Sequence, residues 1–411
     1  MLTARPGGPL AGTVAVPGDK SISHRALILG AMAEGETRIS GLNPGADVAA
    51  TIAALRALGC SIEERPGAGW TVRGSAWHSP AAPIDCGNSG TTARLLVGAF
   101  AGTEGIEATF VGDRSLSARP MGPLVAALRS MGADILGGPT LPLTVRGRRL
   151  LGLAYRNLPP SAQVKSALLF AGLAARVSVR VEEPLPTRDH SEILIAEMGG
   201  GPLHGIAVTI GGDPSAAAFP LVAAAIVTGS EVTIAEVNVN PRRSGLLRTL
   251  ERMGAHVSPI EARCLSGEPI ADLRLRQAGL RACTVPADEV PALIDEVPAL
   301  AAACALAEGR SVIRGLGQLR GKECDRLDAI VAGLGDCGVQ AWADGDDLVI
   351  DGARQVRGGA VDSRGDHRIA MAFLTLGLAS AEGVTVSDTG MIATSFPGFD
   401  QTMRALGADI S

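Results

Sequence analysis

Aromatic residues are scarce in this chain: Phe, Trp and Tyr together make up 3% of its 411 residues. Proteins that bind nucleic acid usually combine basic patches with aromatic side chains for base stacking. This chain has neither, because its net charge is −5 and it carries no long basic block. We therefore expect no nucleic-acid partner. Polar residues interrupt every apolar run before it could span a bilayer, so we expect no membrane association either.

The seven cysteines form no C-x-x-C pair and no cluster with histidine. Scattered cysteines of this kind are typical of free thiols in a reducing compartment, and their spacing does not suit a zinc site. The N-terminal segment shows neither an apolar signal core nor an Arg/Ser-rich transit pattern. The cytoplasm is therefore the expected location. An ordinary P-loop kinase is not supported, because the pattern G-x-x-x-x-G-K-[ST] does not occur.

Glycine, in contrast, is abundant, with 53 residues, and part of it belongs to a repeated motif. An apolar residue, two others and a Leu/Met-like residue precede a glycine in six places. The copies are LRALG (55–59), LRSMG (128–132), IAEMG (195–199), LERMG (250–254), LGDCG (334–338) and MRALG (403–407). Each predicts the end of an amphipathic helix at a left-handed glycine, and in most copies a strand follows. The separations, roughly 55 to 84 residues, suit a βαβαββ unit.

A second series of six segments is apolar almost all round and predicts buried helices. These segments cover residues 21–33, 88–101, 161–175, 214–227, 295–307 and 366–379. Their polar residues gather in the first turn. Capping explains Ser, Asn and Asp there, but Arg25 and Arg368 oppose the helix dipole by about 0.3–1 kcal/mol. Helix N-termini that carry cations form anion sites, so the predicted substrate is small and carries several negative charges.

Eight segments in order along the chain resemble the EPSP synthase family. They are GDKSISHRA (18–26), NSGTTARL (88–95), ARPMGPL (118–124), SAQVKSALLFAGL (161–173), TRDHSE (187–192), GDPSAAAF (212–219), LRGKECDRL (319–327) and GDHRIAMAF (365–373). SAQVKSA together with TRDH is most similar to the bacterial subgroup that includes glyphosate-tolerant members. The resemblance implies an α/β enolpyruvyl transferase fold of two domains, each with three βαβαββ units around buried parallel helices. We place residues 1–14 and 240–411 in one domain and 15–239 in the other, with crossings near 14–20 and 237–244.

The resemblance also implies a reaction of the shikimate pathway, which leads to chorismate and the aromatic amino acids. A 3-phosphoshikimate 1-carboxyvinyltransferase moves the enolpyruvyl group of phosphoenolpyruvate to the 5-hydroxyl of shikimate 3-phosphate and releases phosphate. Addition and elimination each require a proton to be delivered and another to be removed. The family's pattern implies a monomer, with no cofactor and no metal.

The resemblance assigns the site residues by position in these segments. The catalytic residues are Asp295, Glu323 and Lys20. The shikimate 3-phosphate residues are Lys20, Ser21, Arg25, Ser161, Ala162, Gln163, Arg188, Asp295 and Lys322. The phosphoenolpyruvate residues are Lys20, Gly90, Arg119, Gln163, Arg326 and Arg368. Lys165 is expected to face solvent and receives no role. Two positions depart from the family's pattern, Thr394 in place of a lysine and Gln318 in place of an asparagine.

Other functions fit the sequence less well. UDP-N-acetylglucosamine enolpyruvyl transferases carry a cysteine five residues before the arginine of their ARP motif, where this chain has Arg114. RNA 3′-phosphate cyclases share similar repeated units but bind nucleic acid, which the composition disfavours. A catalytically silent relative remains an alternative that only an assay can test, although Lys20, Asp295 and Glu323 are all present.

Overall fold

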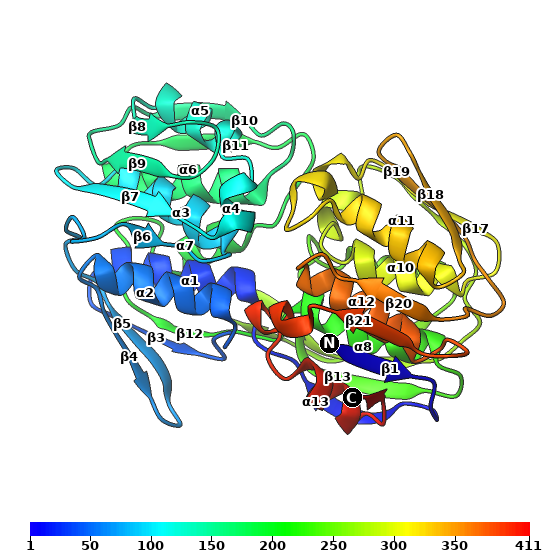
Figure 1. Ribbon diagram of the computed structural model, residues 1–411. Coiled ribbons are helices and arrows are strands. Elements are labelled where there is room, and N and C mark those ends of the chain that lie inside the picture. Colours follow the sequence, from blue (N-terminus) through cyan, green and yellow to red (C-terminus); the bar gives the residue numbers. More distant parts are fainter. The chain divides into compact units, whose positions relative to one another are not determined.

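The structure is a computed structural model that describes all residues, 1–411. The chain folds into two compact units, each with its own hydrophobic core (Figure 1). Unit 1 comprises residues 1–17, 211–264 and 269–411, and unit 2 comprises residues 18–210 and 265–268. None of the helices is long and apolar enough to cross a membrane.

Unit 2 is built of α-helices and three sheets (Figure 1). The helices are α1 (Lys20–Met32), α2 (Ala46–Ala57), α3 (Gly90–Ala101), α4 (Arg114–Ala118), α5 (Gly122–Ser130), α6 (Ala162–Ala175) and α7 (His190–Glu197). The strands are β3 (Glu36–Ser40), β4 (Ser61–Arg65), β5 (Gly69–Arg73), β6 (Ile84–Asp85), β7 (Glu107–Val111), β8 (Asp134–Gly137), β9 (Leu143–Arg146), β10 (Leu153–Arg156), β11 (Val179–Glu182) and β12 (Ala207–Thr209).

Unit 1 is likewise built of helices and three sheets (Figure 1). Its α-helices are α8 (Pro214–Ile226), α9 (Gly245–Arg252), α10 (Val297–Ala305), α11 (Arg326–Asp336), α12 (His367–Gly377) and α13 (Phe399–Ala405), and its 3₁₀ helices are η1 (Val290–Ala292), η2 (Gly317–Gly321) and η3 (Thr389–Thr394). The strands are β1 (Leu2–Arg5), β2 (Ala11–Ala15), β13 (Glu231–Asn238), β14 (His256–Leu265), β15 (Glu268–Arg276), β16 (Thr284–Val285), β17 (Arg310–Ile313), β18 (Gln340–Asp344), β19 (Asp347–Asp351), β20 (Gly359–Asp362), β21 (Val384–Ser387) and β22 (Asp409–Ile410). The turn that joins β14 and β15 packs in unit 2.

The second crossing differs from the sequence-based boundary. The chain returns to unit 1 between Ile210 and Gly211 rather than near residues 237–244. The reason is that α8 lies in the core of unit 1 and β13 pairs with both β2 and β15 of that unit. Each unit thereby holds three of the six buried helices: α1, α3 and α6 in unit 2, and α8, α10 and α12 in unit 1. A boundary near residue 239 would have left four of them in one domain.

The repeated glycine motif marks helix ends as predicted. Helices α2, α5, α7, α9, α11 and α13 each end two residues before the motif glycine. All six glycines have a positive φ, between 81° and 103°. Only glycine adopts this conformation without a steric cost. A strand begins two residues after the glycine in five of the six copies, namely β4, β8, β14, β18 and β22.

Five of the six sheets share one topology. Each has four strands, with the outer pair parallel and the next two pairs antiparallel, as in the order β16-β17-β19-β18. This is the sheet that a βαβαββ unit forms. The exception is the pair β10-β11, which has two strands only. There the helix is followed by three consecutive glycines at positive φ, 199–201, so the chain turns instead of extending, and β12 then pairs with β3 of another sheet.

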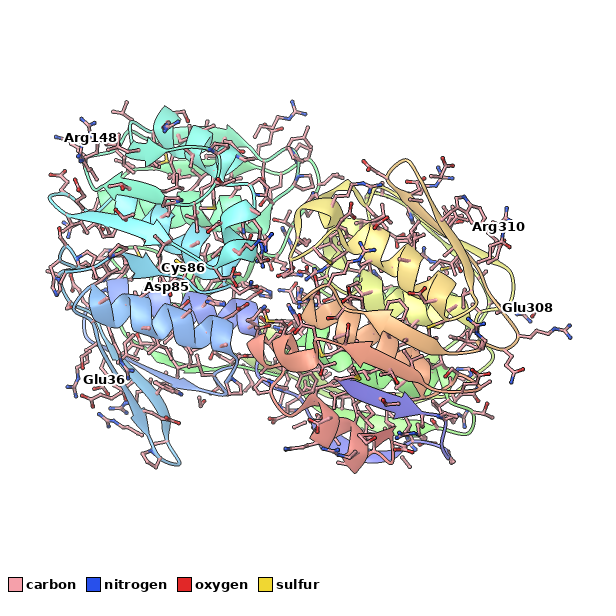
Figure 2. The ribbon with its side chains drawn as sticks, in the orientation of Figure 1. Glu36, Asp85, Cys86, Arg148, Glu308 and Arg310 are labelled. Atoms are coloured by element: carbon pink, nitrogen blue, oxygen red, sulfur yellow. The ribbon has the colours of Figure 1, made fainter.

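Exposed ion pairs lie on the strands of these sheets, and Figure 2 labels Glu36 and Arg310, which belong to two of them. Glu36 on β3 contacts Arg38 and Arg73. Arg310 on β17 donates two hydrogen bonds to Asp351. Such exposed pairs contribute only about 0.2–1 kcal/mol each. The stability of both units therefore rests on the apolar cores rather than on surface charges.

Candidate active site

The starts of the buried helices carry polar residues of two kinds, helix caps and cations. Five of them are side-chain caps: Asp19, Ser89, Ser161, Asp213 and Asp366 each accept a hydrogen bond from a backbone N–H in the first turn. The sixth helix, α10, has Glu296 as its N-cap residue without a side-chain cap. Asp295 therefore lies one residue before the N-cap position. The cations at these helix starts are not explained by capping.

In unit 2, Arg25 is buried in the first turns of α1, where its side chain is 2% exposed. Its guanidinium donates to the Ser21 carbonyl and to the hydroxyls of Ser166 and Ser191, each at 2.8 Å. These acceptors are neutral and satisfy the hydrogen bonds without cancelling the charge. Burial and, next, the positive charge of Arg188 lower the pKa of Arg25 to about 10.

Arg188 lies near the same helix start. Its Nη1 donates to the Ser21 hydroxyl at 3.4 Å. Two guanidinium groups held near each other repel, and an anion between them would remove that repulsion. The structure thus brings Ser21, Arg25 and Arg188 together, as the sequence predicted, in an arrangement that favours a phosphate or carboxylate ligand.

Lys20 begins α1 and is paired with a carboxylate that the sequence analysis did not assign. Its Nζ lies 2.8 Å from Asp47 Oδ2. Asp47 is in the first turn of α2, and its carbonyl also accepts from the Thr92 hydroxyl on α3. Asp47 therefore holds Lys20 and connects it to the next buried helix. The sequence signal was slight, because an aspartate in a first turn is common.

Five further residues lie together at the starts of α3 and α6. Arg119 Nη2 donates to Asn88 Oδ1 at 2.7 Å, and Arg94 Nη1 donates to Gln163 Oε1 at 3.1 Å. A Cβ added at Gly90 would lie 2.5 Å from Arg94 Nη1 and 3.4 Å from Arg119 Nη1. Gly90 therefore lets two guanidinium groups lie against the helix start.

Close packing of α3 on α6 makes this arrangement possible. A Cβ at Gly98 of α3 would lie 2.3 Å from the Ala167 carbonyl of α6. Only glycine permits that approach. Gln163 Nε2 also donates to the Thr91 hydroxyl at 3.0 Å, so the two helix starts are joined directly.

Ser161 and Ala162 begin α6, as expected, and Lys165 follows one turn later. The expectation that Lys165 faces solvent was wrong, because its side chain is 2% exposed. Its Nζ lies 2.7 Å from Glu183 Oε2 and 2.6 Å from Glu192 Oε1. The apolar character of the surrounding helix could have indicated burial. The carboxylate partners lie in later segments, and nothing local predicts them.

In unit 1 the predicted residues also lie together. Asp295 Oδ1 is 3.2 Å from Lys322 Nζ and 3.3 Å from Arg326 Nη1. The backbone carbonyl of Asp295 accepts from Arg368 Nη1 at 2.8 Å. Glu323 Oε2 accepts from Arg326 Nη2 at 2.5 Å. The two carboxylates with predicted proton-transfer roles therefore share one guanidinium.

Arg326 is the centre of this cluster and is 1% exposed. Burial alone would lower its pKa, but the charges of Asp366, Glu323 and Asp295 outweigh burial and raise the pKa above its usual value. Positive and negative side chains are balanced in this cluster. In unit 2, by contrast, the hydrogen bonds of Arg25 at 2.8 Å go to the neutral Ser21 carbonyl and to the hydroxyls of Ser166 and Ser191. Unit 2 thus gathers cations at its helix starts, whereas unit 1 gathers paired cations and carboxylates.

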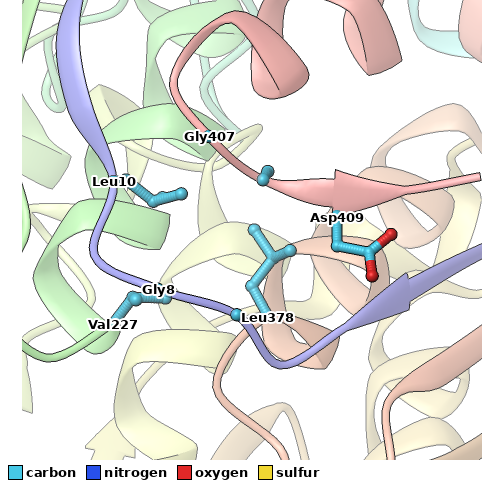
Figure 3. Close-up of a pocket in the computed structure, with 8 residues that line it drawn as sticks. Gly8, Leu10, Val227, Leu378, Gly407 and Asp409 are labelled. Atoms are coloured by element: carbon cyan, nitrogen blue, oxygen red, sulfur yellow. The ribbon is translucent and has the colours of Figure 1, made fainter.

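A shallow crevice in unit 1 does not match these clusters (Figure 3). It is lined by Gly7, Gly8, Leu10, Val227, Leu378, Gly407, Ala408 and Asp409. The lining is apolar apart from one carboxylate and offers no cation to a negatively charged ligand.

Comparison with known proteins places the chain in a family. Residues 4–403 match the family model described as EPSP synthase (3-phosphoshikimate 1-carboxyvinyltransferase). This chain belongs to that family. A relative from Acidiphilium cryptum, named 3-phosphoshikimate 1-carboxyvinyltransferase, is 49% identical, over 99% of this chain and 96% of its own. Another with the same name, from Phenylobacterium zucineum, is 46% identical over 100% and 95%.

Solved structures agree with the family assignment. An EPSP synthase from Acinetobacter baumannii superposes with a TM-score of 0.86 at 38% identity and covers 100% of this chain and 99% of its own. The enolpyruvyl transferase NikO from Streptomyces tendae has a TM-score of 0.75 at 18% identity, which supports the fold alone. The expected two-domain enolpyruvyl transferase fold is confirmed.

Proposed function

We propose that this chain transfers the enolpyruvyl group of phosphoenolpyruvate to the 5-hydroxyl of shikimate 3-phosphate and releases phosphate by addition and elimination. Membership of the 3-phosphoshikimate 1-carboxyvinyltransferase family supports this proposal. The observation that carries it within the molecule is the group of buried cations at the helix starts of unit 2. The two substrates together bring two phosphates and two carboxylates, which require such a group.

The residues of unit 2 are proposed to bind these anions. Arg25 and Ser21 would hold the shikimate carboxylate, while Arg188 and the start of α6 would hold the 3-phosphate. Arg119, Gln163 and the backbone at Gly90 would bind phosphoenolpyruvate, with Lys20 facing its phosphate. The full set is Lys20, Ser21, Arg25, Gly90, Arg119, Ser161, Ala162, Gln163 and Arg188. The hydrogen bonds that Arg25 and Arg119 donate at these helix starts support this assignment, because they hold both guanidinium groups in place.

The residues of unit 1 are proposed to move protons. Asp295 would accept the proton of the 5-hydroxyl, and Glu323 would exchange a proton with the methylene carbon. Lys322 would contact the ring substituents of shikimate 3-phosphate. Arg326 and Arg368 would bind the carboxylate of phosphoenolpyruvate. In support, Arg326 contacts both Asp295 and Glu323, so a ligand carboxylate on Arg326 would lie near both proton-transfer groups.

Phosphate release tests this proposal against its nearest rival. We expect release with phosphoenolpyruvate and shikimate 3-phosphate and none above background with phosphoenolpyruvate and UDP-N-acetylglucosamine. The opposite preference would refute the assignment. No release with either acceptor, from folded protein, would favour the catalytically silent relative.

Glyphosate occupies the phosphoenolpyruvate region in the family that the sequence resembles, and its subgroup includes tolerant members. We nevertheless propose that this chain is inhibited, because Gly90 places no methyl group against Arg94 or Arg119. An inhibition curve that stays flat at high glyphosate would contradict this.

We further propose that the chain acts as a monomer in the cytoplasm. A molar mass near twice the 41.8 kDa of one chain, measured by light scattering, would refute the first part. Fractionation of the native cells with an antibody against the chain tests the second.

A further inference from the structure

Glu183 follows strand β11 and collects hydrogen bonds from three separate segments of unit 2. Its carboxylate accepts from Lys165 Nζ at 2.7 Å, from Thr187 Oγ1 at 2.5 Å and from Asn157 Nδ2 at 3.0 Å. The side chain is 11% exposed. Burial would raise the pKa of Glu183, but the hydrogen bonds from Lys165 and Thr187 outweigh it and lower the pKa. Glu183 therefore acts as a charged acceptor.

The segment that carries Asn157 leads to Ser161. Asn157 Oδ1 accepts from the Ser161 backbone N–H at 3.2 Å, and Asn157 Nδ2 donates to the Ser161 carbonyl at 3.3 Å. Asn157 itself is fully buried. Its amide thus fixes the backbone of the residue that caps α6, and Glu183 fixes the orientation of that amide.

The segment that carries Thr187 leads to Arg188. Thr187 is the residue before it, lies in irregular chain and is 5% exposed. On the far side of Arg188, Glu192 in the first turn of α7 pairs with Lys165 at 2.6 Å. Two polar contacts therefore hold the chain on either side of Arg188. One is made to Glu183 and the other to Lys165, and these two residues pair with each other.

This support matters because Arg188 is held near another cation. The charge of Arg188 acts on the buried Arg25, so in the absence of a ligand anion the two guanidinium groups push each other apart. A restrained chain resists that repulsion and keeps Arg188 oriented for an anion before the anion arrives. Preorganised charges of this kind bind more tightly, because less ordering is required on binding.

We propose that Glu183 is a positioning residue for the 3-phosphate of shikimate 3-phosphate, which acts by fixing the Ser161 turn and the backbone of Arg188. This inference rests on the proposed function, because it assumes that Ser161 and Arg188 bind that phosphate. Lys165 joins the two sides of this support, because its buried ammonium pairs with both Glu183 and Glu192.

The test is Glu183→Gln, which keeps the shape but removes the charge that pairs with Lys165. We expect the KM for shikimate 3-phosphate to rise about tenfold or more, while the KM for phosphoenolpyruvate and the saturating kcat change less than about twofold. General destabilisation would affect both substrates alike. Glu192→Gln removes the other carboxylate that pairs with the same lysine; because its side chain is 40% exposed, we expect a smaller rise in the same KM.

A double-mutant cycle with Arg188→Ala tests the route of the effect. If Glu183 acts through Arg188, the combined variant should raise the KM for shikimate 3-phosphate by much less than the product of the two single effects. A full product would overturn the proposal, as would an unchanged KM in Glu183→Gln. If Glu183→Gln does not fold, Thr187→Val removes one of its hydrogen bonds and must raise the same KM for the proposal to stand.

Two controls separate this inference from the proposed function. Absence of turnover by the unmodified chain would refute the proposed function and this inference with it. An Arg188→Ala variant with an unchanged KM for shikimate 3-phosphate would have the same consequence for the phosphate site. If both controls behave as expected, failure of Glu183→Gln to act would refute this inference alone.

Discussion

Replacing Gly90 with alanine perturbs the helix start where Arg94 and Arg119 lie. The added Cβ would lie 2.5 Å from Arg94 Nη1, about 1 Å closer than an ordinary contact, so the Arg94 guanidinium must move. That group donates to the Gln163 amide at 3.1 Å and to the Pro120 carbonyl at 3.0 Å. Hydrogen bonds from a charged donor contribute about 1.5–3 kcal/mol each. Weakening one of them by about 1.4 kcal/mol would change an affinity about tenfold.

We therefore expect Gly90→Ala to raise the KM for phosphoenolpyruvate about tenfold and to weaken inhibition by glyphosate in parallel. The KM for shikimate 3-phosphate should change less, because Gln163 contacts Arg94 whereas Ser21, Arg25 and Arg188 lie at another helix start. Thermal stability should be maintained, since alanine is favoured over glycine in a helix by about 0.5–1 kcal/mol. Steady-state kinetics with each substrate varied in turn measures this. An unchanged KM for phosphoenolpyruvate, in a variant that folds, would refute the assignment of Gly90 to that substrate.

Three further predictions follow from individual residues. Asp295→Asn should lower kcat by about 10²–10⁴-fold with little change in either KM, because it removes the proposed general base and keeps its shape; turnover near the original rate would show that another group takes the proton. Cys324 should resist alkylation at pH 8, because burial and then the charge of Asp366 raise its pKa to about 12 and only the thiolate reacts; its labelling should increase as the pH rises toward that value. Mass spectrometry after brief iodoacetamide treatment should instead find the exposed Cys264 modified first, and the reverse order would contradict the environment described for Cys324. Gly335→Ala in α11 should stabilise the protein by about 0.5–1 kcal/mol, since an added Cβ meets nothing within 4 Å; a lower Tm by calorimetry would contradict it.

Much of the local structure could be predicted from sequence, because it depends on short-range rules. Each of the six motif glycines ends a helix at positive φ, as the residue type and its position after an amphipathic run require. The buried helices were visible as segments without a polar face, and five of their polar first-turn residues are caps. No strand begins two residues after the third motif glycine, Gly199. The reason is again local, because the three consecutive glycines 199–201 have positive φ.

The sequence by itself thus determined where helices begin and end, which helices are buried, and that cations gather at their starts. Tertiary structure alone decided which charges meet: Lys165 with Glu183, Lys20 with Asp47, and Arg326 with Asp295 and Asp366. It also decided that α8 packs in unit 1 rather than unit 2. The physical reason is range. Caps and glycine turns depend on a few neighbouring residues, whereas a buried ion pair depends on how segments 18 to 40 residues apart pack against each other.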